Sequence, residues 1–370
     1  MKVLVISPRF HPYVGGVERV VKSIYEMLVK KGYDVAVCSL ATSFRLLGSQ
    51  KIRGVLDKKY IIFGPYYLPP PWFLKNIIDH YDIIHIHNIH ALTAITGLFP
   101  VKGKLVISPY YHGKGHTKIA NFFWTFYKPI AKKIFSNADA IVVNSNAQRK
   151  LLAHDFQVPL QKTYLLYDGV DVNGIQNAIP FNVSEKIILY VGRLEYYKYV
   201  HLGILALKYL PLEYKLVIIG RGTYENKLRE ITVANNLQDR VIFLGYQPDN
   251  IVWRWLKTAS VFIQLSRVES FCMACIEALA AGTPIVANDD GLGLRETISL
   301  YPQEILVYRV DEEPIKELAK KIMLASEMKP VKADVSIFSW ERIAERMDRT
   351  YRKILSENSI TYTIDDGYEK

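Results

Sequence analysis

Cysteine is scarce in this chain: Cys38, Cys272 and Cys275 are the only three among 370 residues. A low cysteine content without an export signal is typical of proteins in a reducing compartment. We therefore expect a cytoplasmic protein without structural disulfides. Long apolar runs are also missing, because no stretch approaches the roughly 18 apolar residues of a membrane span. The opening run MKVLVIS is cut off at Pro8 and Arg9 before any cleavage site, which predicts a strand rather than a signal peptide.

The composition is that of a globular protein, with 50% hydrophobic and 22% charged residues and a mean hydropathy of +0.05. At roughly 100–200 residues per domain, the length predicts two domains. The net charge of +11 is unevenly distributed, since residues 1–180 carry 22 Lys and Arg against 10 Asp and Glu, a net +12, and the remainder carries 25 against 26. The first half is therefore expected to face an anionic partner.

Short apolar runs alternate with helical patterns along both halves, which is typical of βαβ units around buried parallel sheets. The expected fold class is α/β, with two doubly wound, Rossmann-like domains. We expect strands at 2–7, 34–40, 82–88, 104–111, 139–145, 186–192, 215–220, 240–245, 261–266 and 284–289, and helices including 16–30, 224–235 and 275–281. The expected domains are 1–180 and 181–338, followed by a helix at 339–356 packed on the body and a polar tail at 357–370.

Two short segments have the residue types of an anion site. Gly15 and Gly16 follow the first strand and open a helix, where backbone N–H groups point outward, although a plain tight turn explains them equally well. The spacing is not the GxGxxG of a dinucleotide fold, which argues against NAD. Arg193 and Lys198 follow the strand that begins at Lys186 and can clamp a pyrophosphate, with plain solvated surface charges as the alternative.

The strongest signal is the stretch RVESFCMACIEALAAGTPIV, which begins at Arg267. It places Glu269 in a loop at the end of a strand and Glu277 inside the following helix. A loop carboxylate can bind sugar hydroxyls, a helix carboxylate can accept from a ribose diol, and the loop N–H groups between them face phosphates. One ligand would therefore span the stretch.

Together these positions resemble glycosyltransferase family 4, a group of retaining, metal-independent enzymes with the GT-B fold. The resemblance covers nearly the whole chain. It rests on Gly15-Gly16, His112-Gly113, Ala138-Asp139 to Asn144-Ser145, Asp168-Gly169-Val170-Asp171, Gly192-Arg193 to Lys198, Phe243-Leu244-Gly245 and the Glu269 to Glu277 pair. It implies sugar transfer, without a cofactor, from a UDP-, GDP- or ADP-sugar to an acceptor, lipid-linked or anionic, in a cleft between the two domains, with the last helix crossing back to the first domain.

The resemblance also implies roles for individual residues. The implied catalytic residues are His112 near the transferred sugar, Arg193 and Lys198 on the pyrophosphate, and Glu269 on the sugar hydroxyls. The other implied donor-binding residues are Gly15 and Gly16 at the diphosphate, Ser270, Phe271, Cys272 and Met273 in the loop, Glu277 at the ribose, and Tyr246 and Gln247 at the base.

Two residues depart from the family pattern. Tyr199 stands where the family usually has Gly after Lys, and Cys272 where it usually has Gly after Ser-Phe. Glycine at the second place lets a backbone N–H approach phosphate closely, so the Cys272 side chain is expected to shift the loop or weaken donor binding.

Two other patterns contain residue types that bind metals, but neither provides a complete set of metal ligands. His85 and His87 lie on one face of a strand, but His90 falls outside that alternation and no carboxylate joins them, so we expect no metal site. Cys272 and Cys275 form a CxxC without a second pair, which favours packing at a helix start.

The segment 116–137 has two interpretations. It combines aromatic and apolar residues with lysines: Phe122, Phe123, Trp124, Phe126, Tyr127, Ile130, Lys118, Lys128, Lys132 and Lys133. The aromatic density favours a core helix with a wet face, and the alternative is a helix that touches a membrane interface. Similar basic and aromatic segments at 45–59 and 66–75 strengthen the alternative, which would make the chain peripheral on the inner face of an anionic membrane.

Two rival functions remain open at this point, and a third is disfavoured. A nucleotide-sugar epimerase of the same fold would form product without an acceptor. A non-catalytic binder of nucleotide sugars or anionic polymers would not hydrolyse the donor. A nucleic-acid binder fits the pI of 9.2, but the complete sugar-donor pattern in the second half argues against nucleic acid as a partner.

Overall fold

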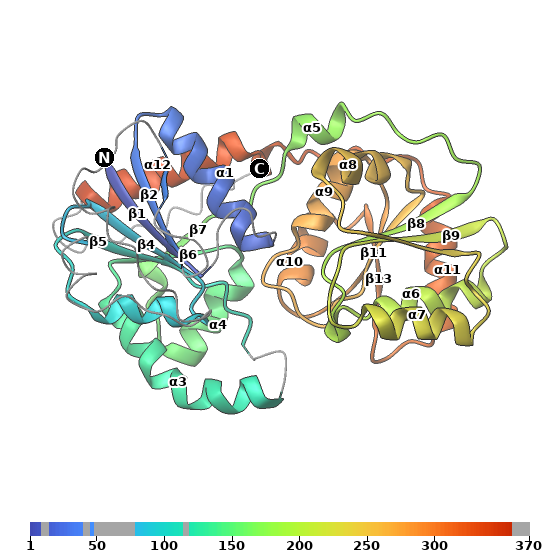
Figure 1. The fold of residues 1–370 in the computed structure, drawn as a ribbon, viewed down its shortest axis with the longest axis horizontal. Helices are drawn as coiled ribbons and strands as arrows, with labels where there is room; N and C mark the ends of the chain where they lie inside the picture. Colours follow the sequence, from blue (N-terminus) through green and yellow to red (C-terminus); the bar gives the residue numbers. More distant parts are fainter. Residues whose placement is uncertain (9–14, 40–44, 48–77, 114–117, 357–370) are drawn as a thin grey trace. The chain divides into compact units, whose positions relative to one another are not determined.

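The structure, a computed structural model, describes residues 1–8, 15–39, 45–47, 78–113 and 118–356 and forms two compact units. Unit 1 is Met1–Gly169 with the chain from Trp340 onward, and unit 2 is Val170–Ser339. Each unit is a mostly parallel sheet between layers of helices (Figure 1), which confirms the expected α/β class with two doubly wound domains. Of the basic and aromatic segment 45–59 only residues 45–47 are described, and the segment 66–75 and the tail at 357–370 lie outside the described residues.

In its described part, unit 1 has a seven-stranded sheet in the order β3-β2-β1-β4-β5-β6-β7. Its strands are parallel except for β3, which pairs antiparallel with β2 at the edge. Helices α1 and α12 cover one face of this sheet and α3 and α4 the other (Figure 1). Its elements are β1 (Lys2–Ser7), α1 (Gly16–Lys30), β2 (Asp34–Ser39), β3 (Arg45–Leu47), β4 (Ile83–His87), η2 (Leu92–Leu98), β5 (Lys104–Ser108), α3 (Lys118–Asn137), β6 (Ala140–Val143), α4 (Asn146–Phe156), η3 (Leu160–Lys162), β7 (Thr163–Leu165) and α12 (Trp340–Ser356).

Unit 2 has a six-stranded parallel sheet in the order β10-β9-β8-β11-β12-β13. Helices α6, α7 and α11 cover one face, and α8, α9 and α10 lie on the other (Figure 1). Its elements are α5 (Val172–Gln176), β8 (Lys186–Val191), η4 (Tyr196–Lys198), α6 (Val200–Ala206), η5 (Leu207–Tyr209), β9 (Tyr214–Ile219), α7 (Glu225–Ala234), β10 (Val241–Gly245), α8 (Asp249–Thr258), β11 (Val261–Gln264), α9 (Met273–Ala281), β12 (Ile285–Asn288), α10 (Gly293–Leu300), β13 (Ile305–Tyr308), α11 (Ile315–Ser326) and η6 (Ser336–Phe338).

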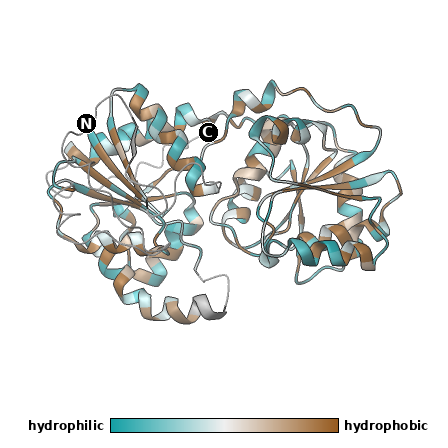
Figure 2. Cartoon of the chain, viewed as in Figure 1, coloured by the Kyte–Doolittle hydropathy of each residue, from teal (hydrophilic) through white to brown (hydrophobic). Residues whose placement is uncertain are grey.

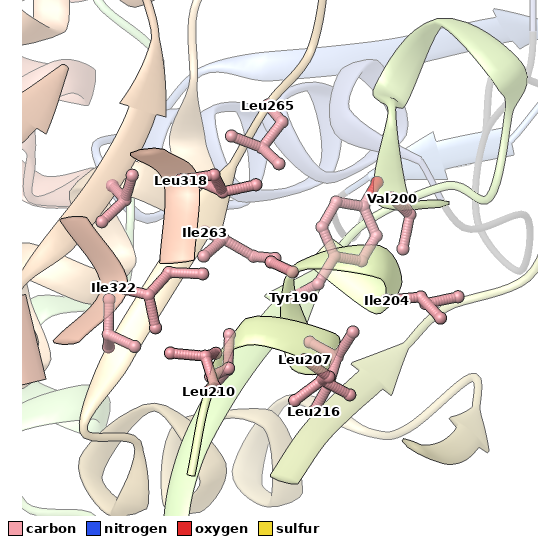
Figure 3. Close-up of a cluster of buried hydrophobic side chains, with 14 of the residues drawn as sticks. Tyr190, Val200, Ile204, Leu207, Leu210, Leu216, Ile263, Leu265, Leu318 and Ile322 are labelled. Atoms are coloured by element: carbon pink, nitrogen blue, oxygen red, sulfur yellow. The ribbon is translucent and has the colours of Figure 1, made fainter. Parts of the chain in front are cut away.

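The apolar runs of the sequence form the central strands because both faces of each sheet are covered. In β1 every residue after Lys2 is buried, and β4 is buried throughout. Hydrophobic residues follow the strands of both sheets in Figure 2. In unit 2 the core beneath α6 and α11 joins Tyr190 and Ile263 to helix residues such as Ile204 and Leu318 (Figure 3). Burial of these side chains fixes the strands and so fixes where the loops at their ends lie.

Each sheet reverses its strand order at its first strand. In unit 2 the chain runs from β8 outward to β9 and β10, then returns to place β11 on the other side of β8. In unit 1 the same reversal lies between β1 and β4. In open α/β sheets the loops at the carboxyl ends diverge at such a reversal, and ligands bind there.

The last helix is fixed to unit 1 by a buried polar cluster, which confirms the expected crossing back of the chain. Tyr351 of α12 places its hydroxyl 2.6 Å from His85 Nδ1 and 3.0 Å from the Tyr25 hydroxyl of α1. The Tyr25 hydroxyl also lies 2.7 Å from His85 Nδ1 and 2.9 Å from His87 Nε2. Burial lowers the pKa of His87 to about 3 and that of His85 well below its usual value, so both rings are neutral partners.

Element boundaries differ from the expected ones in places. The first helix spans the expected 16–30, whereas the strands β3, β7 and β13 were not expected. The units divide between Gly169 and Val170, ahead of the boundary expected at Pro180, because α5 packs on α8 and α9 of unit 2. In the described ranges, no helix combines the length and apolar character that crossing a membrane requires.

Candidate functional site

The candidate site lies in unit 2, where β8 and β11 pair and their carboxyl ends meet. The loop after β8 carries Arg193 and leads through η4 to Lys198. The loop after β11 carries Glu269 and ends at Cys272, where α9 begins. The backbone N–H of Arg267 donates to the Tyr197 carbonyl at 2.9 Å, so the two loops are tied together. The strand order alone places these loops at the reversal where α/β sheets bind ligands.

Lys198 and Glu269 form a buried ion pair at the centre of this edge. The ammonium Nζ of Lys198 contacts Glu269 Oε1, and the two side chains are only 10% and 14% exposed. Burial lowers the pKa of Lys198, but the Glu269 carboxylate beside it raises it, and the net change in pKa is upward. Lys198 is therefore charged across the physiological range, and it is held at the sheet edge by a carboxylate with hydroxyl-binding capacity.

A further side chain, Gln264, orients the pair. Gln264, the last residue of β11, donates through Nε2 to Glu269 Oε1 at 3.1 Å and to Cys272 Sγ at 3.4 Å. Gln264 is buried, and its Oε1 has no hydrogen-bond partner among the described residues. The sequence interpretation missed Gln264, although an amide closing the apolar run VFIQ is a signal of a polar group at a strand end.

Arg193 lies at the exposed rim of the same edge. Its Nη2 donates to the Tyr197 hydroxyl at 2.7 Å, which orients the guanidinium beside the loop that carries Lys198. The Lys198 ammonium in turn lies 5.1 Å from the centre of the Tyr197 ring. The structure thus gathers Arg193 and Lys198 around one aromatic side chain, Tyr197, that the sequence interpretation did not single out.

Asp290, in the loop after β12, holds the loop that carries Glu269 in place. Its Oδ2 accepts the Glu269 N–H at 2.8 Å, and its Oδ1 accepts the Leu292 N–H at 2.7 Å. Burial raises the pKa of Asp290 to about 6, and the backbone N–H donors oppose that rise. The run Asp289-Asp290-Gly291 is typical of a turn, and here the turn also positions the loop of the candidate site.

Gly293 permits the close approach of α10 to the same loop. Its N–H donates to the Glu269 carbonyl at 3.1 Å, and an added Cβ would lie 2.6 Å from the Ser270 carbonyl carbon and 2.7 Å from the Phe271 nitrogen. Any side chain at this position would displace the loop.

Cys272 begins α9 by capping it. Its Sγ accepts from the Cys275 N–H at 3.4 Å and lies 3.0 Å from Cys275 Sγ, with both residues buried. Glu277 lies one turn further along α9 and is also buried. The loop residues Ser270, Phe271 and Met273 stand between the two glutamates, as the sequence pattern requires.

The two departures from the family pattern differ physically. Tyr199 has φ 52°, in the left-handed region that favours glycine, and its ring packs against Tyr196 and His201 at 5.7 and 5.6 Å. A non-glycine residue in this region is strained by roughly 1–2 kcal/mol. Cys272 has φ −109°, which any residue adopts, so its side chain introduces no backbone strain.

Tyr246 and Gln247 follow β10, which lies two strands from β8 in the sheet. Neighbouring strands are about 5 Å apart, so these residues lie roughly 10 Å along the same edge. Tyr246 is half exposed, and Gln247 donates to the Leu244 carbonyl at 2.7 Å. They extend the edge away from the ion pair.

The remaining predicted residues lie in unit 1. Gly15 caps α1, and the Glu18 carboxylate folds over it, since a Cβ there would lie 2.2 Å from Glu18 Oε2. Gly16, the first residue of α1, has open space around it. His112 follows β5 and stacks on His90 with ring centres 4.9 Å apart. The three histidines of the run DIIHIHNIH separate, because His85 and His87 belong to the tyrosine cluster and His90 to this stack. The described residues contain no group of three or more His, Cys, Asp or Glu that could hold a metal ion.

The edge of unit 2 can therefore bind a ligand that has both anionic and hydroxyl groups. Arg193 and Lys198 supply positive charge, and the partly buried Glu269 and the buried Glu277 offer hydrogen-bond acceptors for hydroxyls. The N-terminal turn of α9 adds backbone N–H donors between the two carboxylates.

Comparisons with known proteins show what this chain resembles in sequence and in fold. The chain is 26% identical over 391 residues to an uncharacterized glycosyltransferase of Methanocaldococcus jannaschii, with 95% of this chain and 98% of the relative covered. It is 23% identical to a phosphatidylinositol N-acetylglucosaminyltransferase subunit of Arabidopsis thaliana, with 96% and 82% covered. The Anabaena protein HepE, solved in complex with UDP-glucose, has the same fold with a TM-score of 0.73 at 17% identity, over 95% of this chain and 100% of HepE.

Two family profiles divide the chain between them. Residues 14–173 match Glycosyltransferase Family 4, and residues 171–335 match the glycosyl transferases group 1. These matches, the relatives and the shared architecture show that the chain belongs to the family 4 and group 1 glycosyltransferases and has the GT-B fold.

Proposed function

We propose that this protein is a retaining, metal-independent glycosyltransferase that binds its nucleotide-sugar donor at the β8–β11 edge of unit 2. The observation that carries the proposal is the buried Lys198–Glu269 pair at the strand reversal. Lys198 and Arg193 hold the diphosphate, Glu269 binds the sugar hydroxyls and Glu277 binds the ribose. Tyr246 and Gln247 lie further along the edge and are proposed to contact the base.

The proposed chemistry needs charge stabilisation more than a protein nucleophile. The bond between the sugar C1 and the diphosphate oxygen breaks while the acceptor oxygen bonds to C1 on the same face. The acceptor proton passes to the departing phosphate oxygen. Arg193 and Lys198 stabilise the negative charge that grows on the diphosphate, because they are held in place before the reaction begins. His112 is proposed to contact the transferred sugar.

The acceptor is proposed to be lipid-linked or anionic and to be reached from the cytoplasmic side of a membrane. The +12 net charge of residues 1–180 supports an anionic partner. The relationship to a phosphatidylinositol N-acetylglucosaminyltransferase subunit supports a lipid acceptor.

The phosphate clamp predicts loss of diphosphate binding in Arg193→Ala and in Lys198→Ala. Hydrogen bonds to charged groups contribute about 1.5–3 kcal/mol, so each change should weaken UDP, GDP or ADP binding by roughly 10–100-fold. Calorimetric titration measures the affinity, and Lys227→Ala, which removes an exposed lysine paired with Glu230, is the control. Because Lys198→Ala leaves Glu269 without its ammonium partner, the double variant Lys198→Ala with Glu269→Gln separates lost binding from lost folding. Unchanged affinity in both single variants would contradict the clamp.

Substitutions of the two glutamates should have different effects, because Glu269 and Glu277 are proposed to bind different parts of the ligand. Glu269→Gln removes the counter-charge of Lys198 but not the lysine, so nucleoside diphosphate affinity should stay within about 3-fold while turnover falls at least about 10-fold. Glu277→Gln should reduce both quantities. Affinity and turnover measured on the same preparations decide this, and an equal loss of diphosphate affinity in the two variants would refute the division.

Metal independence predicts that activity persists in excess chelator, because two cationic side chains occupy the place of a divalent ion at the diphosphate. Sugar transfer would be assayed before and after EDTA treatment. Loss of activity with EDTA, and its return with magnesium or manganese, would show that a metal is required.

A further inference from the structure

Helix α3 exposes a cluster of large aromatic side chains. Phe122, Phe123 and Phe126 are 62%, 64% and 66% exposed, and Ile130 on the next turn is 38% exposed. The ring of Phe122 lies 5.7 Å from that of Phe123 and 5.1 Å from that of Phe126, so the three rings form one surface. We call these four residues the aromatic face of α3. Single exposed apolar residues are common on protein surfaces, whereas contiguous exposed apolar side chains mark interaction sites.

The opposite side of the helix is already fully packed. Trp124 is buried, with its ring 4.4 Å from His90 and 5.6 Å from Tyr111. About three helical turns further along α3, Phe135 packs on Phe156 of α4, with ring centres 5.0 Å apart. The core interpretation of the sequence therefore holds for one side of α3 only. Because the inner side fixes the helix, the aromatic face cannot turn inward without breaking this packing.

Lysines continue the exposed side toward the end of the helix. Phe122, Phe126, Ile130 and Lys133 follow one another at spacings of four, four and three residues, which places them on one stripe. At 1.5 Å per residue this stripe is about 16 Å long. Lys132 beside it is exposed, and its ammonium contacts the uncharged Gln157 amide, so its charge is not neutralised there. Lys128 differs, since its Nζ lies 4.0 Å from the Asp155 carboxylate.

We propose that the aromatic face of α3 inserts into the interface of an anionic membrane, with Lys132 and Lys133 at the level of the lipid phosphates. The combination of exposed phenylalanines with lysines on one side of a helix is the pattern of helices that lie in a membrane surface. The +12 charge of residues 1–180 complements anionic lipid. This inference rests on the lipid-acceptor part of the proposed function, and it assigns that part to a defined surface.

The proposed insertion differs from attraction by charge alone. Lysine attraction falls with salt over a Debye length of about 8 Å at physiological ionic strength, whereas burial of phenylalanine does not. Binding should therefore need both anionic lipid and the aromatic face, and part of it should survive high salt once the protein is bound.

The test is flotation of the full chain with phosphatidylcholine vesicles that contain increasing phosphatidylglycerol. The triple variant Phe122→Ser, Phe123→Ser, Phe126→Ser should bind at least about 10-fold more weakly than the unchanged chain. The double variant Lys132→Glu, Lys133→Glu should lose its response to phosphatidylglycerol. The matched control is Leu212→Ser, Val233→Ser, Leu324→Ser, which removes three comparably exposed apolar residues from unit 2 and should bind as the unchanged chain does.

A direct readout of insertion uses Phe126→Trp. Its added fluorescence should shift to shorter wavelength with anionic vesicles and be quenched by brominated lipid chains. Equal flotation of the triple variant and its control, or a Phe126→Trp signal unchanged by vesicles, would overturn the proposal. Self-association that the triple variant loses, without vesicle binding by the unchanged chain, would assign the face to a second copy and overturn it as well.

Nucleotide binding separates this inference from the proposed function. UDP, GDP and ADP affinities would be measured on the same variants without vesicles, and the triple variant should bind them normally. A chain that binds a nucleotide but ignores anionic vesicles overturns the membrane face and leaves the donor site intact. A chain that floats through α3 but binds none of the nucleotides overturns the donor site instead.

Discussion

A buried lysine needs a counter-charge, and the architecture of unit 2 supplies it from a strand that is distant in sequence. Lys198 follows β8 and Glu269 follows β11, and these strands meet only because the sheet reverses its order at β8. Removing one member of a buried ion pair typically costs about 3–5 kcal/mol, whereas replacing both by apolar residues is often neutral. The pair is therefore poorly explained by stability and well explained by a ligand that needs one cation and one acceptor at the same place.

The surrounding contacts maintain the pair before any ligand arrives. Gln264 orients the Glu269 carboxylate, Asp290 accepts the Glu269 N–H, and Gly293 lets α10 approach the loop. Such preorganisation matters because a site that must rearrange to meet developing charge stabilises it less. The same contact supplies the counter-charge that Lys198 needs in the free protein.

Much of the fold could be predicted from periodicity, and the failures have physical causes. The strands at 2–7 and 186–192 are long apolar runs, and the helix at 16–30 has a clear helical pattern, so they were predicted nearly as they are. Strands β3 and β7 are three residues long and carry too few residues to show an alternation. The unit boundary was misplaced because α5 is fixed by packing on α8 and α9, which local sequence does not reveal.

The candidate site shows the same division. Motif and resemblance single out Arg193, Lys198, Glu269 and Glu277 as candidates, but the contact between Lys198 and Glu269 depends on sheet order and not on spacing. Asp290 has the local pattern of a turn, and its hold on the Glu269 loop is visible only in three dimensions. The aromatic residues of α3 are alike in sequence, yet Trp124 is core and Phe126 is exposed, because only the packing of α3 on its unit separates the two sides.

The central claim is that the donor binds at the β8–β11 edge, and amide hydrogen exchange of the full chain with and without a nucleotide sugar tests it most directly. The account predicts slower exchange at residues 193–199, at the loop 267–272 and in the first turn of α9 when the nucleotide sugar binds. Slower exchange confined to unit 1, with these three segments unchanged, would contradict it.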